Sequence, residues 1–455
     1  MTGELLSGIP EVKMKPIASK EGPHGNWIIF SYFFNIDAKA SSQHIDDRIP
    51  QLAPLGVKPF IVSSICAERS SDAAHFRVPS IAPSGVRFEL RYLKRRNKFF
   101  KFAAIPLLIM ILPLYFIEKA IINLESEWSW FPLAFLRGLL LSAKFHPELI
   151  YSTGGPASAH IAAGLLARWT KTPWIAELQD PIVFKDWKRS KTALKINSRL
   201  ERFILQKASA VIFLTEAARE RAVQRTNVDA SKVHVIYPGA RAAEGPQTIY
   251  RKGDSCRFAH FGSFGGSRNP GNFLEGVQIL LDQNPDLIEK VRLDFFGAMD
   301  RFSAKLVARF KHRQVVTYFG KVPRLEALRA MRKTDALVLI ENLDDLSCEM
   351  IPAKVYEYLQ MNRPILGLVY QNSHLRRMLL ERGHFVTQGD SPAGISEQIA
   401  QIVELWGRGD WDSLNFPNSP YSVRDAAEKL LAISRGALHG TLGDGARMSP
   451  SNRPR

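Results

Sequence analysis

Residues 336–369, ALVLIENLDDLSCEMIPAKVYEYLQMNRPILGLV, contain the pattern that decides the fold. The apolar runs at 336–340 and 364–368 have the length and composition of buried strands. Between them, Pro352 is well suited to the first turn of a helix. Two buried strands joined through a helix are typical of a parallel sheet. The stretch therefore predicts a strand–helix–strand unit of an α/β protein.

The same alternation of strands and helices extends along the chain and forms two series. The first series has predicted strands at Trp27–Phe34, Lys58–Ser63, Leu149–Tyr151, Trp174–Glu177, Ala210–Leu214 and Val233–Tyr237. The second series has predicted strands at Arg257–Phe261, Val291–Phe296, Val315–Phe319, Ala336–Ile340 and Pro364–Leu368. Two such series predict two Rossmann-like domains whose parallel sheets face each other across a cleft. In such sheets, ligands bind at the carboxyl ends of the strands.

The domain boundaries follow from segments without apolar periodicity. Residues 241–255 are polar and contain glycine, which is typical of a linker. They separate an N-terminal domain at 26–240 from a C-terminal domain at 256–435, which is predicted to end with a closing helix. Residues 1–25 and 436–455 are predicted to be disordered tails. A chain of 455 residues is long enough for two domains of this size.

The chain carries a net charge of +17, with 61 Lys and Arg against 44 Asp and Glu. Such an excess suits nucleic acid, an anionic membrane surface or phosphorylated ligands. No recognition-helix or stacking-aromatic pattern accompanies the charge, which argues against nucleic acid. Cys66, Cys256 and Cys348 have no CxxC spacing, so neither a disulfide framework nor a zinc site is predicted. The first residues lack the apolar core of a signal peptide, and a cytoplasmic location is expected.

Residues 102–117, FAAIPLLIMILPLYFI, are uncharged and follow a basic stretch at 91–98. A membrane span needs about 20 apolar residues, and Pro106 and Pro113 would interrupt a helix. A single crossing would also separate strands of one predicted sheet. We therefore expect segment 99–123 to lie in one leaflet, with the basic residues at the lipid phosphates. A buried helix pair in the first domain is the alternative.

Glu349 and Glu357 lie eight positions apart between the two strands of the opening segment. If the helix starts at Pro352, Glu349 precedes it and Glu357 lies in its second turn. The free N–H groups at a helix N-terminus attract a diphosphate, and Lys354 adds positive charge there. A carboxylate in the second turn suits hydrogen bonds from ribose hydroxyls. The alternative is that Glu357 and Lys354 are solvent-exposed residues of the helix.

A glycine turn follows the first strand of the second series. After Gly262, the sequence SFGGSRNP leads into a predicted helix, which lets backbone N–H groups approach a phosphate. Arg268 is the residue placed to neutralise that phosphate. The glycine spacing is not G-x-G-x-x-G, so a dinucleotide site is not predicted. A structural turn with a solvated arginine is the alternative.

A second glycine turn lies in the first series, in STGGPASAH at 152–160. It follows a predicted strand, and His160 falls in the first turn of the next helix, where it is expected to point into the cleft. Asp180 lies at the carboxyl end of the next strand. A lone histidine in this position is also compatible with a structural role in the core.

The E-x7-E spacing, followed by EYL and RPILGLV, resembles the donor site of glycosyltransferase family 4 and related retaining enzymes of the GT-B fold. The stretch from STGGPASAH to Asp180-Pro181 is similar to the acceptor-domain loops of these enzymes. The resemblance implies that Glu357 binds the nucleotide ribose and that Glu349 contacts the donor sugar. It also implies donor-site roles for Gly262, Ser263, Arg268 and Lys354, and roles for His160 and Asp180 in orienting sugar or acceptor. Ser263 replaces a basic residue, and Met350 and Ile351 replace a glycine, in the family's pattern.

The resemblance implies a retaining glycosyltransferase with a GT-B fold that uses a nucleoside diphosphate sugar as co-substrate, without a metal or another cofactor. The expected acceptor is a membrane-associated lipid or a polysaccharide of the bacterial surface. The expected location is the cytoplasmic face of the inner membrane, on its anionic surface, without nucleic acid or an obligate protein partner. Two alternatives remain open. They are a nucleotide-sugar epimerase of the same fold and a non-catalytic binding protein.

Overall fold

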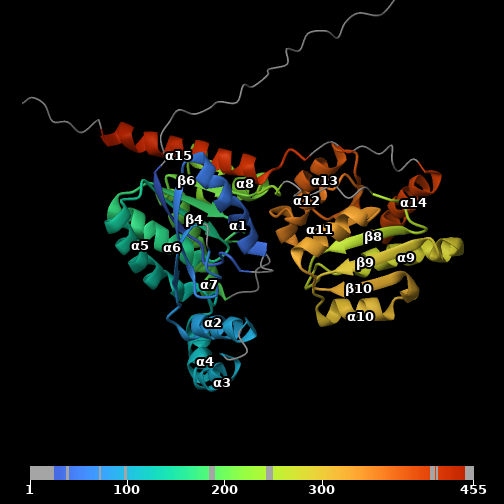
Figure 1. Cartoon of the computed structure of the whole chain (residues 1–455), viewed down its shortest axis with the longest axis horizontal. Coiled ribbons are helices and arrows are strands. Elements are labelled where there is room, and N and C mark those ends of the chain that lie inside the picture. Colours follow the sequence, from blue (N-terminus) through green and yellow to red (C-terminus); the bar gives the residue numbers. More distant parts are fainter. Residues whose placement is uncertain are drawn as a thin grey trace, which may run out of the picture.

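The computed structural model describes residues 25–36, 40–70, 73–96, 100–183, 190–241, 250–409, 416 and 419–445. It contains one sheet of seven strands and one of six, each packed between helices. The two sheets form two domains that lie side by side (Figure 1). Most of the predicted linker at 241–255, residues 1–24 of the predicted tail at 1–25, and residues 446–455 of the predicted tail at 436–455 lie outside the described residues.

The first sheet has the strand order β3-β2-β1-β4-β5-β6-β7, and all its neighbouring strands are parallel. Its strands are β1 Asn26–Phe30, β2 Lys58–Ser64, β3 Ala74–Val78, β4 Leu149–Gly154, β5 Trp174–Leu178, β6 Ala210–Phe213 and β7 Val233–Val235. The six strands predicted for this series are confirmed, and β3 is an additional strand at the edge. The helices of this domain include α1 Ala40–Leu52, α5 Phe131–Phe145, α6 Ala157–Thr170, α7 Lys191–Lys207 and α8 Glu216–Thr226.

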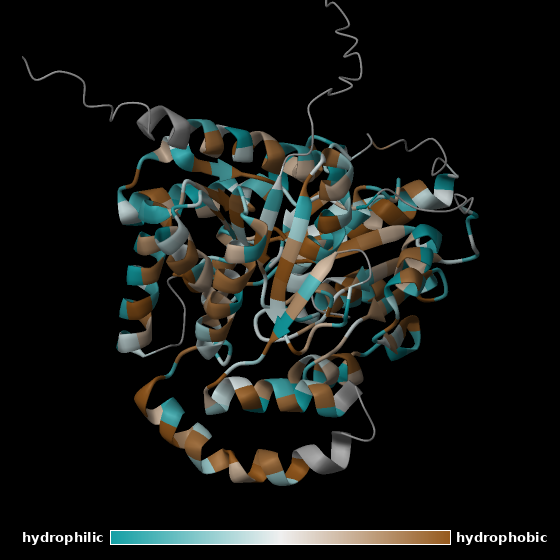
Figure 2. Ribbon diagram, turned by 60° about the vertical axis from the view of Figure 1, so that its left-hand side comes forward, coloured by the Kyte–Doolittle hydropathy of each residue, from teal (hydrophilic) through white to brown (hydrophobic). Residues whose placement is uncertain are grey.

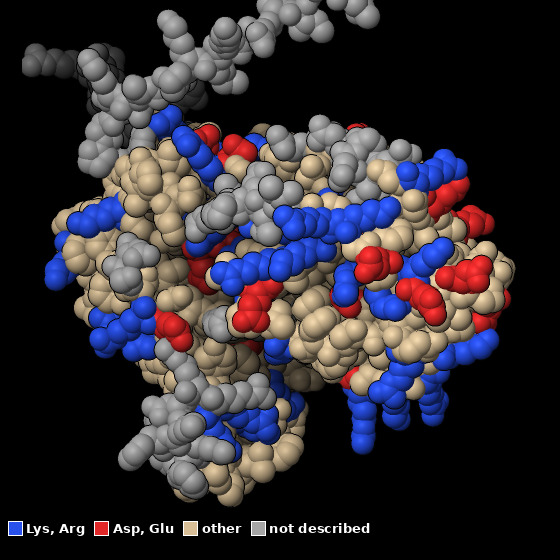
Figure 3. All heavy atoms as spheres, turned by 45° about the vertical axis from the view of Figure 1, so that its right-hand side comes forward, with Lys and Arg blue, Asp and Glu red and all other residues tan. Residues whose placement is uncertain are grey.

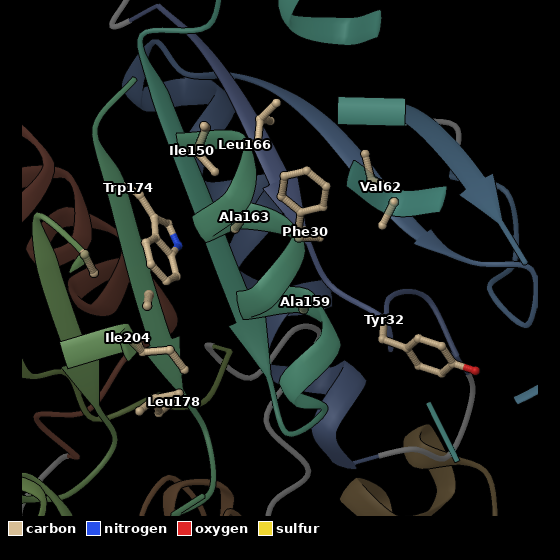
Figure 4. Close-up of a cluster of buried hydrophobic side chains, with 14 of the residues drawn as sticks. Phe30, Tyr32, Val62, Ile150, Ala159, Ala163, Leu166, Trp174, Leu178 and Ile204 are labelled. Carbon is tan, nitrogen blue, oxygen red and sulfur yellow. The ribbon is translucent and has the colours of Figure 1, made fainter. Parts of the chain in front are cut away.

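Both faces of the first sheet are buried, because its strands carry apolar side chains that alternate between two cores. On one face, Phe30 and Ile150 pack against Ala163 and Leu166 of α6 (Figure 4). On the opposite face, Ile45 of α1 belongs to a separate apolar cluster. Burial on both faces fits the continuous apolar runs that predicted these strands.

The second sheet has the order β10-β9-β8-β11-β12-β13 and is also parallel. Its strands are β8 Cys256–Phe261, β9 Val291–Phe296, β10 Val316–Gly320, β11 Ala336–Ile340, β12 Ile365–Val369 and β13 Phe385–Gln388. The five predicted strands are confirmed, and β13 is an additional edge strand. The helices are α9 Gly271–Gln283, α10 Arg301–Arg309, α11 Arg324–Lys333, α12 Lys354–Tyr358, α13 Ser373–Leu380 and α14 Pro392–Arg408.

The last helix, α15, spans Val423–Gly445 and returns to the first domain. Its apolar residues Ala427 and Leu430 pack in one cluster with Trp27 of β1 and Ile45 of α1. Figure 1 shows α15 lying across the first domain. The sequence-based boundary had grouped this closing helix with the second domain. The helix also continues into the segment predicted as a tail from residue 436, because its apolar face finds a partner on the first sheet.

The uncharged segment forms part of a lobe made by α2 Pro83–Arg96, α3 Phe100–Met110 and α4 Leu112–Ile121. The lobe extends away from the two sheets (Figures 1 and 2). Pro113 lies in the first turn of α4, whereas Pro106 lies inside α3. No residue of α4 is buried, so the alternative of a buried helix pair is wrong. Among the described residues, no helix has the length and apolarity needed to cross a membrane.

Candidate functional site

The loops that carry the predicted donor site meet at one edge of the second sheet. Because the strands are parallel, the segments that follow β8, β9 and β11 all leave from their carboxyl ends. Gly262 N–H donates to the carbonyl of Phe296 at 2.8 Å. Gly297 has φ 128°, and a Cβ there would lie 2.0 Å from the Gly262 oxygen. Only glycine permits this approach, which holds the Gly262 loop against the end of β9.

Glu357 is a buried carboxylate with several donors around it, and its side chain is only 6% exposed. Its Oε1 accepts hydrogen bonds from Gln43 Nε2 at 3.1 Å and Arg324 Nη2 at 3.1 Å. Its Oε2 accepts from Lys354 Nζ at 2.7 Å. Burial alone would raise the pKa of Glu357, but Lys354 and Arg324 outweigh it and hold that pKa below its usual value. Glu357 is therefore an ionised, oriented acceptor, and the alternative of a solvent-exposed residue is wrong.

Glu349 is also buried, but its partners come from the first domain. Its Oε1 accepts from Arg221 Nη1 at 3.0 Å, and Arg225 Nη1 lies 3.8 Å from its Oε2. Its backbone carbonyl accepts from Thr215 Oγ1 at 2.6 Å. Burial raises the pKa of Glu349, and Arg221 opposes that rise. The two glutamates of the E-x7-E spacing thus lie on one segment but contact different helices.

The helix that carries Glu357 differs from its prediction. α12 begins at Lys354 and ends at Tyr358, so Glu357 lies in its first turn and Pro352 precedes it. The Pro352 carbonyl accepts from Val355 N–H at 3.0 Å, which closes a tight turn before the helix starts. The predicted start at Pro352 and the placement of Glu357 in the second turn are therefore wrong. A helix of five residues has a small dipole, so charge at this edge comes chiefly from side chains.

Two nitrogens beside the Gly262 loop have no hydrogen-bond partner within the described part of the chain. They are Arg268 Nε and His260 Nε2, and both atoms are buried. His260 donates from Nδ1 to the carbonyl of Val338 at 3.0 Å, so Nε2 is the unprotonated nitrogen of the neutral ring. Burial, with added repulsion from Arg268 and Lys354, lowers the pKa of His260 to about 4. An unsatisfied buried donor such as Arg268 Nε is suited to a ligand oxygen.

The other candidates near this loop differ in exposure. Ser263 is exposed on the loop itself. Burial lowers the pKa of Arg268, and the nearby carboxylates of Glu341 and Asp344 raise it and so partly offset the effect of burial. Burial also raises the pKa of Glu341 to about 7, and Glu341 was not predicted from the sequence. No side-chain signal in the sequence marks it, because it follows β11 directly as an ordinary polar residue.

His160 and Asp180 differ in burial, because His160 is buried and Asp180 is exposed. His160 has no exposed surface, and Ser152 Oγ lies 2.8 Å from its Nδ1. Burial lowers the pKa of His160 to about 4, so its ring is neutral. The expected orientation of His160 into the cleft is therefore wrong, since the ring packs between α6 and β4. Asp180 is exposed, and its Oδ2 lies 2.9 Å from the position of a Cβ at Gly155.

The two domains contact each other through a charged set that sequence reasoning missed. Arg324 of α11 binds Asp47 of α1 at 3.1 Å while also binding Glu357. Arg241 binds the same Asp47 carboxylate at 2.6 Å. Together with Gln43, these residues connect the first domain to the predicted ribose acceptor. On the outer face of the molecule shown in Figure 3, lysine and arginine side chains are interleaved with carboxylates.

Comparison with solved structures identifies the fold. Sucrose-phosphate synthase from Thermosynechococcus elongatus is 12% identical, covers 91% of this chain and 100% of its own, and has a TM-score of 0.59. HepE from Anabaena, solved with UDP and glucose, is 13% identical, with coverages of 92% and 100% and a TM-score of 0.57. A putative UDP-N-acetylglucosamine 2-epimerase from Listeria monocytogenes is 11% identical, with coverages of 91% and 97% and a TM-score of 0.53. These likenesses show the fold, which is GT-B.

A family model also matches part of the chain. Residues 52–239 match the glycosyl transferase 4-like domain. The N-terminal domain is therefore similar to the glycosyl transferase 4-like domain, and the chain has a glycosyltransferase-like GT-B fold. No curated protein sequence matches the chain significantly.

Proposed function

We propose that the protein is a retaining glycosyltransferase that moves a sugar from a nucleoside diphosphate sugar to a membrane-associated or polysaccharide acceptor of the bacterial surface. The observation that carries this proposal is the Glu357 carboxylate. It is buried and ionised, it is oriented by Lys354 and Arg324, and it lies at the strand ends where ligands bind in such sheets. A donor site needs an acceptor of this kind for ribose hydroxyls.

The proposed donor complex uses the charges of the second domain. Ribose hydroxyls donate to Glu357, and the diphosphate lies beside Arg268 and Lys354. When the sugar leaves, negative charge grows on the diphosphate, and these two cations stabilise it. The charge of the side chains serves in place of a metal, so the proposal includes no metal and no other cofactor. Glu349 is proposed to contact the donor sugar, with Gly262 and Ser263 near the phosphates.

The acceptor side of the proposal concerns the loop after β4. Asp180, exposed beside Gly155, is proposed to bind the acceptor hydroxyl. His160 has no exposed surface, so it acts as a positioning residue that supports this loop from beneath. In the resembled family the E-x7-E spacing accompanies retention of the anomeric configuration. That spacing supports attack on the face of the sugar from which the diphosphate leaves.

Nucleotide-sugar binding is the first test of this proposal. Thermal-shift titration with UDP- and GDP-sugars is expected to raise the unfolding midpoint, since a ligand at 100 times its Kd stabilises by about 2.7 kcal/mol. Arg268→Gln is expected to weaken binding of the stabilising sugar nucleotide about tenfold, through the loss of one charge-assisted hydrogen bond of roughly 1.5 kcal/mol. Lys311→Gln, an exposed cation of the same domain, is the matched control.

The outcomes separate the three functions. Transfer of label to an acceptor supports the transferase. Conversion of the sugar nucleotide without any acceptor would show an epimerase instead, which the likeness in fold to the Listeria protein makes worth measuring. If no sugar nucleotide changes the midpoint, a non-catalytic binding protein replaces both.

Peripheral attachment to the anionic cytoplasmic face of the inner membrane is the second part of the proposal. It is supported by the exposed apolar side chains of α3 and α4 and by the basic residues of α2. Deletion of residues 102–117 is expected to move the protein from the membrane pellet to the supernatant after ultracentrifugation of a cell lysate. An unchanged distribution would contradict attachment through this segment.

A further inference from the structure

The outer face of the lobe is apolar and has no partner in the described chain. Six side chains of α3 and α4 are each more than half exposed: Ile109, Met110, Leu114, Phe116, Ile117 and Ile121. Figure 2 shows these two helices as a largely hydrophobic strip on the side away from the sheets. Contiguous apolar surface of this kind marks a contact with a membrane or another molecule.

The lobe is fixed to the first domain by hydrogen bonds at its root. Glu118 of α4 accepts from Ser84 N–H at 2.7 Å and from Trp128 Nε1 at 2.7 Å. Glu89 of α2 accepts from Ser80 N–H at 3.0 Å and from Tyr32 Oη at 3.2 Å. These carboxylates tie α2 and α4 to the ends of β1 and β3. The apolar face therefore has a set orientation relative to the first sheet.

The positive charge of the lobe favours an anionic lipid leaflet as the partner of its apolar face. Arg87, Arg91 and Lys94 lie on α2, which packs against α3 and α4, and the Arg87 guanidinium lies over the Tyr115 ring at 4.2 Å. Cations next to an apolar surface match a leaflet with anionic headgroups. Two copies of the lobe would instead bring like charges together, which disfavours a dimer through this face.

The root of the lobe also contacts the loop proposed to bind the acceptor. Glu125, which follows α4, has its Oε2 3.5 Å from the backbone nitrogen of Ala157, the first residue of α6. Ala157 is two residues after Gly155, and Gly155 adjoins Asp180. The chain after α4 is thus linked, through Ala157 and Gly155, to the position of Asp180. A polysaccharide in solution would gain nothing from this arrangement.

From this juxtaposition we infer that the acceptor is an amphiphile, a lipid-linked alcohol or sugar whose tail stays in the leaflet under α3 and α4. Its hydroxyl reaches the loop at 154–156 beside Asp180. The hydroxyl oxygen forms a bond to the anomeric carbon, and the bond from that carbon to the diphosphate oxygen breaks. The electron pair stays with the diphosphate, which also takes up the hydroxyl proton. This inference rests on the proposed transferase function and specifies the acceptor of that same site.

Replacing three lobe residues tests the inference. The variant Ile109→Ser/Met110→Ser/Phe116→Ser removes apolar surface that is not part of the core. The matched control is Phe302→Ser/Leu380→Ser, which removes exposed apolar side chains of the second domain. Each protein is sedimented with phosphatidylcholine vesicles that contain or lack about one third phosphatidylglycerol. We expect the wild type and the control to sediment with the anionic vesicles, and the lobe variant to remain in solution.

Transfer of label measures the acceptor directly. Each protein receives the labelled sugar nucleotide that stabilises it, together with vesicles of a bacterial total lipid extract or with delipidated surface polysaccharide. Label is expected in the organic extract, and the lobe variant is expected to reduce it at least about tenfold, as lost membrane binding lowers the local concentration of the acceptor. Binding of the nucleoside diphosphate to the lobe variant, measured by calorimetry, is expected to stay unchanged.

The outcomes are distinguishable. Label found only in the polysaccharide, or lipid labelling by the lobe variant at the wild-type rate, overturns the inference and leaves the transferase proposal intact. If sugar nucleotides bind and no label moves to either acceptor, the transferase proposal fails and this inference fails with it. A wild-type dimer that the lobe variant converts to a monomer would show that a second copy covers the face.

Discussion

Glu357→Gln is expected to lower kcat/KM for sugar transfer by about 100-fold or more. The substitution keeps the shape of the side chain but removes the charge that accepts from ribose hydroxyls. Two hydrogen bonds to a charged group are worth about 3 kcal/mol or more together, and each 1.4 kcal/mol is a factor of ten. Steady-state kinetics with the stabilising sugar nucleotide measures the change. The pH profile should keep its shape, since Glu357 has a lowered pKa and is ionised throughout the working range.

A change in folding must be separated from a change at the site. Lys354 and Arg324 would lose a charged partner in the variant, so the unfolding midpoint is measured beside the kinetics. Glu428→Gln is the matched control, because it removes a carboxylate from an exposed pair with Arg424. Wild-type turnover in Glu357→Gln would remove Glu357 from the site. Equal losses in both variants would assign the effect to something other than ribose binding.

Most of the strands that the sequence predicted are buried on both faces, although the predicted edge strand β10 is largely exposed. β11 and β12 are buried along their whole length, and their apolar runs are unmistakable. The two strands that were missed, β3 and β13, lie at sheet edges. Their residues are partly exposed, AHFRV in β3 and FVTQ in β13, so no continuous apolar run marks them. An edge strand has one neighbour and needs less apolar surface, which makes it harder to predict from one sequence.

Site residues that lie close together in the sequence could be predicted, whereas pairs of residues that are distant in the sequence could not. Glu349 and Glu357 were predicted because they lie near each other in the chain and beside a strand end. Gln43 donates to Glu357 across 314 positions, and Arg221 donates to Glu349 across 128. A single sequence contains no signal for such pairs, because they depend on how the domains dock. The burial of His160 was also missed. The helical periodicity of α6 does not tell whether a residue in its first turn points into the core or into a cleft.

A buried ion pair in the first domain is the basis of the largest expected effect on stability. Arg48 of α1 pairs with Glu177 of β5, and both side chains are 1% exposed. Arg48 Nη1 also donates to Tyr151 Oη at 2.9 Å, and Thr153 Oγ1 donates to Glu177 at 2.8 Å. Burial alone would raise the pKa of Glu177, but the Arg48 guanidinium outweighs it and lowers that pKa. The pair is charged and largely closed to water.

Arg48→Met is expected to destabilise the first domain by about 3–5 kcal/mol, because it leaves the Glu177 carboxylate buried without its cation. That loss corresponds to a fall of about 10 °C in the unfolding midpoint. Arg48→Met/Glu177→Leu is expected to recover most of the loss, since the remaining apolar pair leaves no unpaired charge. Differential scanning calorimetry of the three proteins measures these midpoints. Arg408→Met, which breaks an exposed pair with Glu404, is expected to leave the midpoint unchanged.

The pH dependence gives a second signature of the pair. In the wild type the lowered pKa of Glu177 contributes stability above its unfolded pKa of about 4.3, and this contribution is lost as the pH falls through the folded pKa. In Arg48→Met the burial of Glu177 is opposed only by hydrogen bonds from neutral groups such as Thr153, so the folded pKa of Glu177 is expected to rise above the unfolded value, and protonation then stabilises the folded state as the pH falls. The midpoint difference between the two proteins is therefore expected to be largest near neutral pH and smaller at about pH 5. A difference that is independent of pH would mean that Arg48 stabilises the domain through packing and not through the charge of Glu177.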